Sequence, residues 1–302
     1  MMRPVDSLLD FLRAEEARGV RNVHLDDQAK EVLRELHRRA RVAKPSAAPS
    51  PRPAAPSASA AAAPSASRMP MASSAPVSSP ASASPARIAV PSLGGPAEKI
   101  AALAEQAAHW APARQLGTLR DRLVFSAGDP AARLMLLGEA PGYHEEQQGT
   151  PFAGPAGQKL DDILRAMGLD RSQVYISNLV KCRPASPGQT TNNRKPTPEE
   201  MACWLPFVRA EISVLRPSCI IALGASAAEG LLGLSGAVAA MRGRWHDFEG
   251  IPVRVTYHPA YLLRGTSGNS DKRAVWEDML EAMEKLGLPI SDKQRGYFTK
   301  PG

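Results

Sequence analysis

A polar, glycine-rich loop contains the first residues whose types could do chemistry. It spans residues 138–157, reads GEAPGYHEEQQGTPFAGPAG and directly follows the apolar run 134–137. A turn and a helix cap would explain its glycines, but not its carboxylates and aromatic ring. It contains neither GxGxxG leading into a helix nor GxxxxGK followed by Ser or Thr, the patterns of nucleotide-binding loops. We predict a functional site with the candidate residues Glu139, Glu145, Glu146 and Phe152.

A second segment, YHPAYLLR at 257–264, combines a histidine with two leucines and an arginine. A predicted strand ends at His258, and Pro259 stops the β-ladder because it has no backbone N–H. The simplest alternative is a structural histidine followed by leucines that pack inward. However, an apolar side chain beside a basic one is also what proteins insert into a base stack. We favour this second interpretation for Leu262, Leu263 and Arg264.

Asn178 ends another predicted strand. An asparagine in this position could cap a turn. Its amide also offers donor hydrogens and an acceptor oxygen, which suits hydrogen bonding to the edge of a planar base. Both interpretations are open at this point.

The three cysteines, Cys182, Cys203 and Cys219, do not form a recognisable metal motif. Structural zinc and iron–sulfur clusters commonly have four ligands, often including a CxxC pair, and the chain has no CxxC. Cys219 falls inside a predicted strand, where we expect it to be part of the core. His109 is a conceivable fourth ligand, but its spacing does not support that role. A sparse, odd number of cysteines favours a reducing compartment.

Apolar strands that alternate with helices must position these residues. This alternation is typical of a parallel sheet covered on both faces, whose ligands bind outside the carboxyl ends of the strands. The 138–157 loop, Asn178, Gly224 and His258 all follow or end predicted strands, so the sequence predicts one site at one edge of the sheet. The strands are predicted at 133–138, 174–178, 219–224 and 253–258, and the helices at about 96–109, 157–167, 198–215, from 225, and 271–286.

Composition divides the 302-residue chain into three parts. Residues 44–91 are nearly all Ala, Pro and Ser, so they bury too little apolar area to offset their ordering entropy, and we expect a disordered linker. Residues 1–43 contain two predicted helices, which could contact the main body or a protein partner. Residues 92–302 are long enough for a complete core.

The net charge of +7 favours a polyanionic partner, either nucleic acid or anionic lipid, although charge alone does not establish one. The N-terminal residues show no apolar signal-peptide region, and no stretch has the length of a transmembrane helix. We expect a cytoplasmic monomer that does not bind membranes.

Several segments resemble, in order and spacing, the uracil-DNA glycosylase superfamily, and within it the bacterial and archaeal family 4 enzymes. The resemblance covers about residues 97–286 and implies an α/β fold, a three-layer αβα sandwich with a central, mainly parallel four-stranded sheet. The matching segments are 138–142, 145–146, 149–154, 177–184, 222–225, 242–243 and 258–264.

The resemblance implies a DNA N-glycosylase that flips uracil out of DNA and hydrolyses its N-glycosidic bond, which initiates base excision repair. Uracil leaves as an anion, and His258, with loop amides, would stabilise the charge on its O2 oxygen. Other branches of the superfamily place an aspartate where this chain has Ala140. Either Glu139 or Glu145 would therefore position the attacking water or stabilise the sugar cation, unless His258 acts alone.

The resemblance also implies the residues that bind the substrate. Phe152 would stack on the flipped base, Asn178 would read its edge, and Gly138 and Ala140 would complete the uracil pocket. Leu262 would fill the vacated position in the base stack. The remaining implied DNA-binding residues are Leu263, Arg264, Lys181, Arg183 and Arg244, which predicts salt-sensitive binding.

Two further departures from the family pattern concern the cluster and one DNA contact. Family 4 enzymes usually hold a four-iron cluster, but residues 111–116 read APARQL where the first cysteines should be. Cys182 matches the third ligand, whereas Trp204, next to Cys203, takes the position of the fourth. We predict no cluster, no other cofactor and no metal, with packing in the place of the cluster. Ala260 replaces the usual serine of the family, which removes one phosphate contact, and we expect activity to survive.

Two alternatives to uracil excision are open from the sequence. The chain could be a non-catalytic DNA-binding or scaffold protein on a glycosylase fold, or it could excise another deaminated base such as hypoxanthine or xanthine. Retention of the acidic, aromatic and histidine candidates together argues against the first alternative, and Asn178 favours uracil over other bases.

Overall fold

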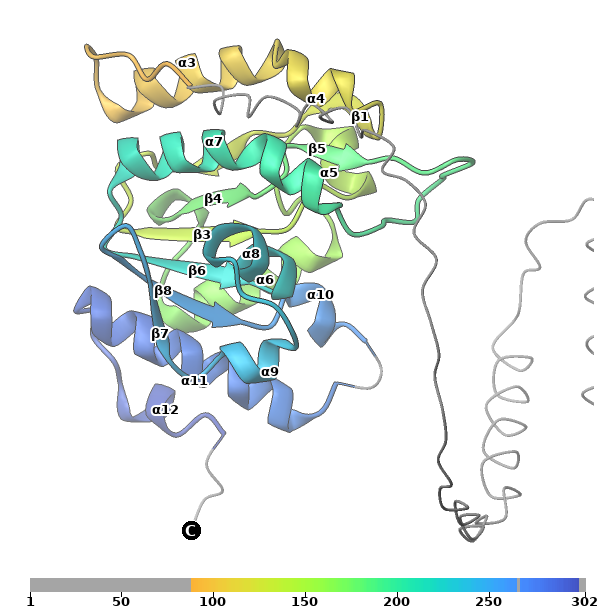
Figure 1. The fold of residues 1–302 in the computed structure, drawn as a ribbon. Helices are drawn as coiled ribbons and strands as arrows, with labels where there is room; N and C mark the ends of the chain where they lie inside the picture. The colour runs from red at the N-terminus through yellow and green to blue at the C-terminus, as the bar shows by residue number, and fades with distance from the viewer. Residues whose placement is uncertain (1–87, 265–266, 299–302) are drawn as a thin grey trace, which may run out of the picture. The chain divides into compact units, whose positions relative to one another are not determined.

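The computed structural model describes residues 88–264 and 267–298 (Figure 1). The predicted helical segment 1–43 and the predicted linker up to residue 87 lie outside the described residues.

Four parallel strands form the middle of the main sheet, as the sequence predicted, and the structure orders them β4-β3-β6-β8. Strands β3, β4 and β6 are buried at every position, which explains their continuous apolar sequences. The sheet is wider than the predicted four strands, because the short antiparallel strands β2 and β7 extend its edges. The bounds are Ser126–Gly128 (β2), Leu134–Gly138 (β3), Tyr175–Asn178 (β4), Cys219–Leu223 (β6), Trp245–Phe248 (β7) and Ile251–Thr256 (β8).

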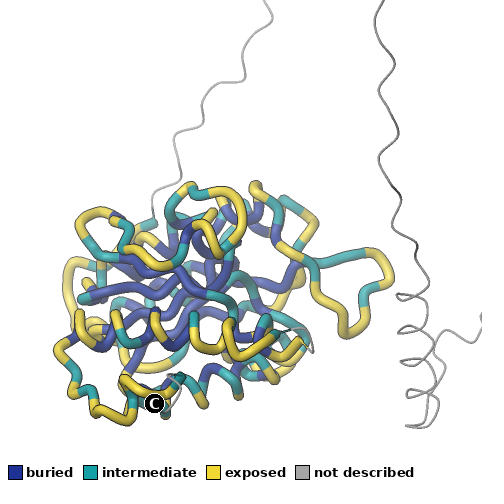
Figure 2. Tube along the Cα trace, turned by 90° about the horizontal axis from the view of Figure 1, so that it is seen from below, coloured by how far each residue is buried: buried dark blue, intermediate teal, exposed yellow. Residues whose placement is uncertain are grey.

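Helices cover both faces of this sheet, as predicted for a three-layer αβα sandwich (Figure 1). Alternate residues of a strand point to opposite faces, so Met135 and Leu137 join one core cluster while Leu134 and Leu136 join the other. Figure 2 shows the buried strands between more exposed outer segments. The first cluster packs under α3 (Pro96–Ala108), α4 (Ala111–Gln115), α7 (Pro198–Leu215) and α8 (Ala225–Leu232), and the second under α6 (Pro155–Met167) and α11 (Asn269–Leu286).

Helix α7 shows why the predicted helix boundaries agree closely with the structure. The Glu200 N–H donates to the Thr197 hydroxyl (3.2 Å), and the Thr197 N–H donates to the Glu200 carboxylate (2.8 Å), which forms a capping box. Pro198 occupies the first helical position, where its missing N–H costs nothing.

Short elements escaped the prediction because three to six residues show too little periodicity. The most consequential is α5 (Tyr143–Gln148), which lies inside the segment predicted as a loop. No helix in the described part of the chain is long and apolar enough to cross a membrane. The other short elements are β1 (Leu119–Leu123), η1 (Arg171–Gln173), β5 (Cys182–Pro184), α9 (Val238–Met241), α10 (Pro259–Leu262) and α12 (Asp292–Arg295).

The carboxyl ends of the four parallel strands lie side by side. Gly138 of β3 is the register partner of Asn178 of β4, and Leu223 of β6 is the partner of Thr256 of β8. The residues that follow these strands therefore meet at one edge of the sheet.

Candidate active site

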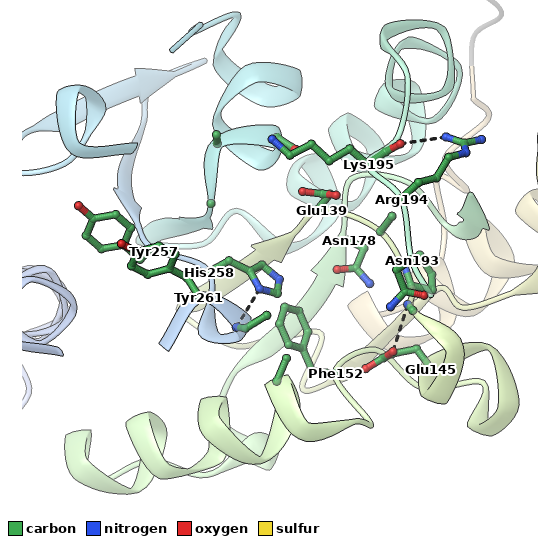
Figure 3. A pocket seen from close by; sticks show the side chains of 18 of the residues that line it. Glu139, Glu145, Phe152, Asn178, Asn193, Arg194, Lys195, Tyr257, His258 and Tyr261 are labelled. Carbon is green, nitrogen blue, oxygen red and sulfur yellow. Dashed lines mark hydrogen bonds between the residues drawn. The ribbon is translucent and has the colours of Figure 1, made fainter. Parts of the chain in front are cut away.

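A cavity of about 450 Å³ opens at this edge of the sheet. Most of the residues that the sequence singled out as catalytic or base-binding line it, and Figure 3 shows their side chains around the opening. The sequence-predicted residues in the lining are Glu139, Ala140, Glu145, Phe152, Asn178, His258 and Arg264.

Glu139 follows β3 directly and is partly buried in the cavity wall. Burial raises the pKa of its carboxyl group, while a hydrogen bond with Ser226 and the positive charge of Lys195 act in the opposite direction. Its hydrogen-bonding partner Ser226 comes from the first turn of α8, and Lys195 comes from the loop before α7. Glu139 is thus a carboxylate exposed to the cavity and held in a low-dielectric setting.

Glu145 uses both carboxylate oxygens to brace the loop. The Gly142 N–H donates to its Oε2 (3.1 Å) and the Gly154 N–H donates to its Oε1 (3.0 Å). These bonds cap α5 and tie together two turns that are far apart in the loop. The third acidic candidate, Glu146, forms an ion pair with Arg183 (2.8 Å). The Glu139 carboxylate is therefore less engaged in contacts that hold the loop together than Glu145 or Glu146 is.

Gly138 allows the side chains of Asn178 and Phe152 to approach the end of β3. A Cβ atom at position 138 would lie 2.2 Å from Asn178 Oδ1 and 2.7 Å from Phe152 Cζ, so only glycine fits. Both side chains are buried, with 2% of Asn178 and 4% of Phe152 exposed. An amide and an aromatic ring thus meet against one bare backbone segment of the cavity wall.

His258 follows β8 and faces the ring of Phe152, with 5.5 Å between ring centroids and 24° between ring planes. The Ala260 N–H donates to His258 Nδ1 (3.1 Å). Burial lowers the pKa of His258 to about 4, although the Glu145 charge acts in the opposite direction. At neutral pH the ring is therefore uncharged, and because Nδ1 accepts a hydrogen bond, its proton is on Nε2.

The structure corrects two of the predicted phosphate contacts. Lys181 is completely buried and forms an ion pair with Glu211, and Arg183 is 1% exposed and pairs with Glu146. The guanidinium of Arg183 also donates to the carbonyls of Thr190 (2.9 Å) and Asn192 (2.7 Å). Both cations are buried and paired within the protein, so neither side chain is accessible to a DNA phosphate in this structure.

The two leucines after His258 have opposite environments. Leu262 is 9% exposed and packs into the core cluster under α6 and α11, so the prediction that it enters the base stack does not agree with its position. Leu263 is 47% exposed. Arg264 and Arg244 are also exposed, and the Arg264 guanidinium lies 5.6 Å from the ring centroid of Tyr261.

The sequence prediction missed several residues that line the cavity. Asn193 and Lys195 come from the loop before α7, where Arg194 anchors the backbone by donating to the Glu200 carboxylate (2.8 and 2.5 Å) and to the Lys195 carbonyl (2.9 Å). The only signal in the sequence was the NNRK run, and asparagine is also common in ordinary turns. Further lining residues to which the sequence analysis gave no role include Ser226, Val238, Tyr257 and Tyr261.

The three cysteines do not fit a four-thiolate cluster. Cys182 and Cys203 lie near each other on the side of α7, but Cys219 belongs to the core cluster on the opposite side of the sheet. Trp110 occupies the neighbourhood of Cys203, where its Nε1–H donates to the Cys203 carbonyl (3.2 Å) and its ring packs edge-on against Phe207. Burial raises the pKa of the Cys182 thiol to about 12. The described residues contain no group of three potential metal ligands.

Comparison with known proteins agrees with this geometry. Residues 125–280 match the family model of the uracil DNA glycosylase superfamily. A type-4 uracil-DNA glycosylase of Thermotoga maritima is 41% identical over 165 residues, covering 54% of this chain and 82% of the relative. One of Pyrobaculum aerophilum is 39% identical over 153 residues, covering 48% and 75%. A type-5 uracil-DNA glycosylase of P. aerophilum is 32% identical over 152 residues, covering 45% and 64%.

The fold is an αβα sandwich whose cavity opens at the carboxyl ends of its parallel strands. The chain belongs to the uracil-DNA glycosylase superfamily, on its type-4 branch.

Proposed function

We propose that this protein is a uracil-DNA glycosylase that excises uracil from DNA and so initiates base excision repair. The observation that carries the proposal is the meeting of four groups in one cavity: the Asn178 amide, the Phe152 ring, the uncharged imidazole of His258 and the Glu139 carboxylate. The type-4 relatives are named for the same activity.

Recognition of the base rests on Asn178 and Phe152. A base within a duplex is out of reach, so the nucleotide must rotate out of the stack into the cavity. The Asn178 amide then hydrogen-bonds to the uracil edge while the Phe152 ring stacks on its face. Ala140 lines the cavity, while Gly138 lets the Asn178 and Phe152 side chains approach the end of β3.

His258 stabilises the departing base. Cleavage of the N-glycosidic bond leaves negative charge on uracil O2, and the Nε2–H of the uncharged imidazole donates a hydrogen bond to that oxygen. The bond between the Ala260 N–H and Nδ1 fixes the tautomer that this step requires. No proton transfer from a charged imidazole is needed.

Glu139 positions the attacking water and faces the cationic sugar. It is favoured over Glu145 because both oxygens of Glu145 already accept backbone hydrogen bonds. Burial raises the pKa of Glu139, and the Ser226 hydrogen bond and the Lys195 charge favour the ionised form that this role uses.

The DNA-binding surface consists of exposed side chains near the cavity. Leu263 replaces Leu262 as the apolar side chain that enters the vacated stack, since Leu263 is the exposed member of the pair. Arg264, Arg244 and Lys195 neutralise phosphates. We further propose that the protein acts in the cytoplasm. We also propose that it holds no iron–sulfur cluster, because residues 111–116 contain no cysteine and the three cysteines present lie on opposite sides of the sheet.

One experiment tests both the uracil-excision activity and the proposed role of Glu139. The purified full-length protein is incubated with uracil-containing and matched thymine- and hypoxanthine-containing oligonucleotides, and abasic sites are quantified. We expect release of uracil and a loss of roughly 10²–10⁴-fold in kcat for Glu139→Gln, the range typical of a lost acid–base group.

One comparison variant and two contrary outcomes complete the test. Asn178→Asp should gain activity on cytosine, because an aspartate edge matches that base instead. Wild-type protein that binds DNA but releases no base would establish the non-catalytic alternative, and faster release of hypoxanthine than of uracil would establish the other substrate.

A further inference from the structure

Phe152 adopts a backbone conformation that a bulky residue seldom occupies. Its φ angle is +55°, in the left-handed region, whereas most residues with positive φ are glycines. Such conformations persist only where the surrounding structure enforces them, and they concentrate at functional sites. Some contact must therefore hold the Phe152 backbone in place.

Arg171 supplies that contact from outside the cavity. It lies in η1, nineteen residues beyond Phe152, and its Nη2 donates to the Phe152 carbonyl (2.5 Å). Its Nη1 donates to the preceding carbonyl, that of Pro151 (3.2 Å). The Arg171 guanidinium therefore donates to the backbone carbonyls on both sides of the Phe152 N–Cα bond, those of Pro151 and Phe152.

Asp161 of α6 orients this guanidinium. The Nε–H of Arg171 donates to Asp161 Oδ1 (2.6 Å), and the two side chains are about one-third exposed. Three donors on one planar group thus serve three fixed acceptors. Lysine could not reproduce this arrangement, because its donors share one atom.

The first turn of α6 packs against the same carbonyl. A Cβ atom at Gly157 would lie 1.6 Å from the Phe152 oxygen and 2.9 Å from Arg171 Nη2. The bare helix backbone and the guanidinium thus both confine this carbonyl. At the other end of the residue, the ring packs against Gly138 and faces His258.

We propose that Arg171, oriented by Asp161, is a positioning residue that holds the Phe152 ring at the angle needed to stack on the flipped base. The inference rests on the proposed function in assigning the base to Phe152. Arg171 itself does not line the cavity, so it acts through the backbone of residues 151–152.

The chain offers a matched control for this proposal. Arg165 and Asp162 lie on the same helix and form an ion pair (3.1 Å), but they are exposed and make no contact with the loop. Arg165→Gln and Asp162→Asn therefore remove a similar charge pair without touching Phe152.

The first measurement is steady-state excision of uracil together with competitive inhibition by free uracil. We expect Arg171→Gln to reduce kcat/KM by about 10- to 100-fold, in line with the cost of a small misplacement of a substrate-positioning group. The inhibition constant for uracil should rise in Arg171→Gln. For both constants, Arg171→Lys and Asp161→Asn should lie between the wild type and Arg171→Gln. Both control variants should match the wild type. In a Phe152→Ala background, Arg171→Gln should have little further effect on kcat/KM.

Hydrogen exchange of residues 149–157 gives a second measurement that needs no activity. We expect faster exchange of these amides in Arg171→Gln than in Arg165→Gln. Equal exchange in the two variants, an unchanged inhibition constant, or a full additional loss in the Phe152→Ala background would overturn the proposal. Failure of the wild type to release uracil would instead overturn the proposed function, and the exchange comparison would still decide the role of Arg171.

Discussion

Burial determines the chemical state of His258. The side chain lies at the end of a buried strand, faces an aromatic ring and accepts the Ala260 N–H. Burial destabilises the charged imidazolium more than the nearby Glu145 charge stabilises it, so the ring is neutral at physiological pH. A neutral donor suits the proposed step, since it stabilises the departing anion without first losing its own proton.

This state predicts a pH-dependent stability. The pKa of His258 is about 4 in the folded protein and near its ordinary value of 6.5 in the unfolded chain. The unfolded state therefore binds more protons below about pH 6.5, and stability falls as the pH drops toward 4. Between pH 7.5 and 5 the contribution is about 2 kcal/mol.

Urea denaturation at several pH values measures this effect. We expect the free energy of unfolding of His258→Gln to fall less than that of the wild type over this interval, by roughly that amount. Identical pH dependence in the two proteins would mean that His258 titrates normally in the folded state.

At the scale of elements, a buried polar network fixes the turn after β4 against α7. The Lys181 ammonium donates to Glu211 and to the Ser177 hydroxyl (2.6 Å), and the Tyr175 hydroxyl donates to Glu211 (2.8 Å). The same turn is bonded to the end of β3, since the Leu179 N–H donates to the Gly138 carbonyl (2.9 Å). The network therefore stabilises the strand end that presents Asn178.

Breaking this network should be costly. Lys181→Met leaves the Glu211 carboxylate without its cation in a fully buried position, so we expect the free energy of unfolding to fall by about 3–5 kcal/mol. Adding Glu211→Gln should restore part of that loss by removing the unpaired charge. Chemical denaturation at pH 7.5 provides the measurement.

The exposed pair Arg209–Glu249 is the control for this prediction. Arg209→Met should cost less than about 1 kcal/mol, as is usual for surface ion pairs. A similar cost for Lys181→Met would show that the buried pair contributes no more than a surface pair.

At the scale of the whole molecule, the net charge of +7 does not identify which cations contact DNA. Arg183 and Lys181 are internal, and Arg194 is committed to Glu200 and to loop carbonyls. Under the proposed function, fewer exposed cations than the sequence suggests could contact DNA, and Arg264, which lines the cavity, is one of them.

Salt dependence separates these classes of cation. We expect DNA affinity to fall with salt concentration on a log–log plot, and the slope for Arg264→Met to be shallower than that of the wild type by about one. Arg165→Met, which removes an exposed arginine that does not line the cavity, should keep the wild-type slope. Fluorescence anisotropy with a uracil-free oligonucleotide gives the slope, and equal slopes for all three proteins would exclude a phosphate contact by Arg264.

Local pattern was sufficient to predict the central strands, the long helices and the edge of the sheet where the site lies. Buried parallel strands are continuous apolar runs, and caps such as Thr197 and Glu200 act within a few residues. The candidate residues Glu139, Phe152, Asn178 and His258 could be located because each follows or ends such a strand or lies in the loop after it.

The tertiary structure alone decided which of the candidate side chains are buried or already bonded within the protein. Lys181 can be buried because its ion-pair partner is Glu211 on α7, which is 30 residues further along the chain. Glu145 stabilises the loop because the Gly154 N–H donates to its carboxylate. Leu262 is buried while Leu263 is exposed, and Phe152 is held by Arg171 from a different element. In each case the environment of the side chain depends on contacts between distant segments, which set its burial, its charge state and its free hydrogen-bonding groups.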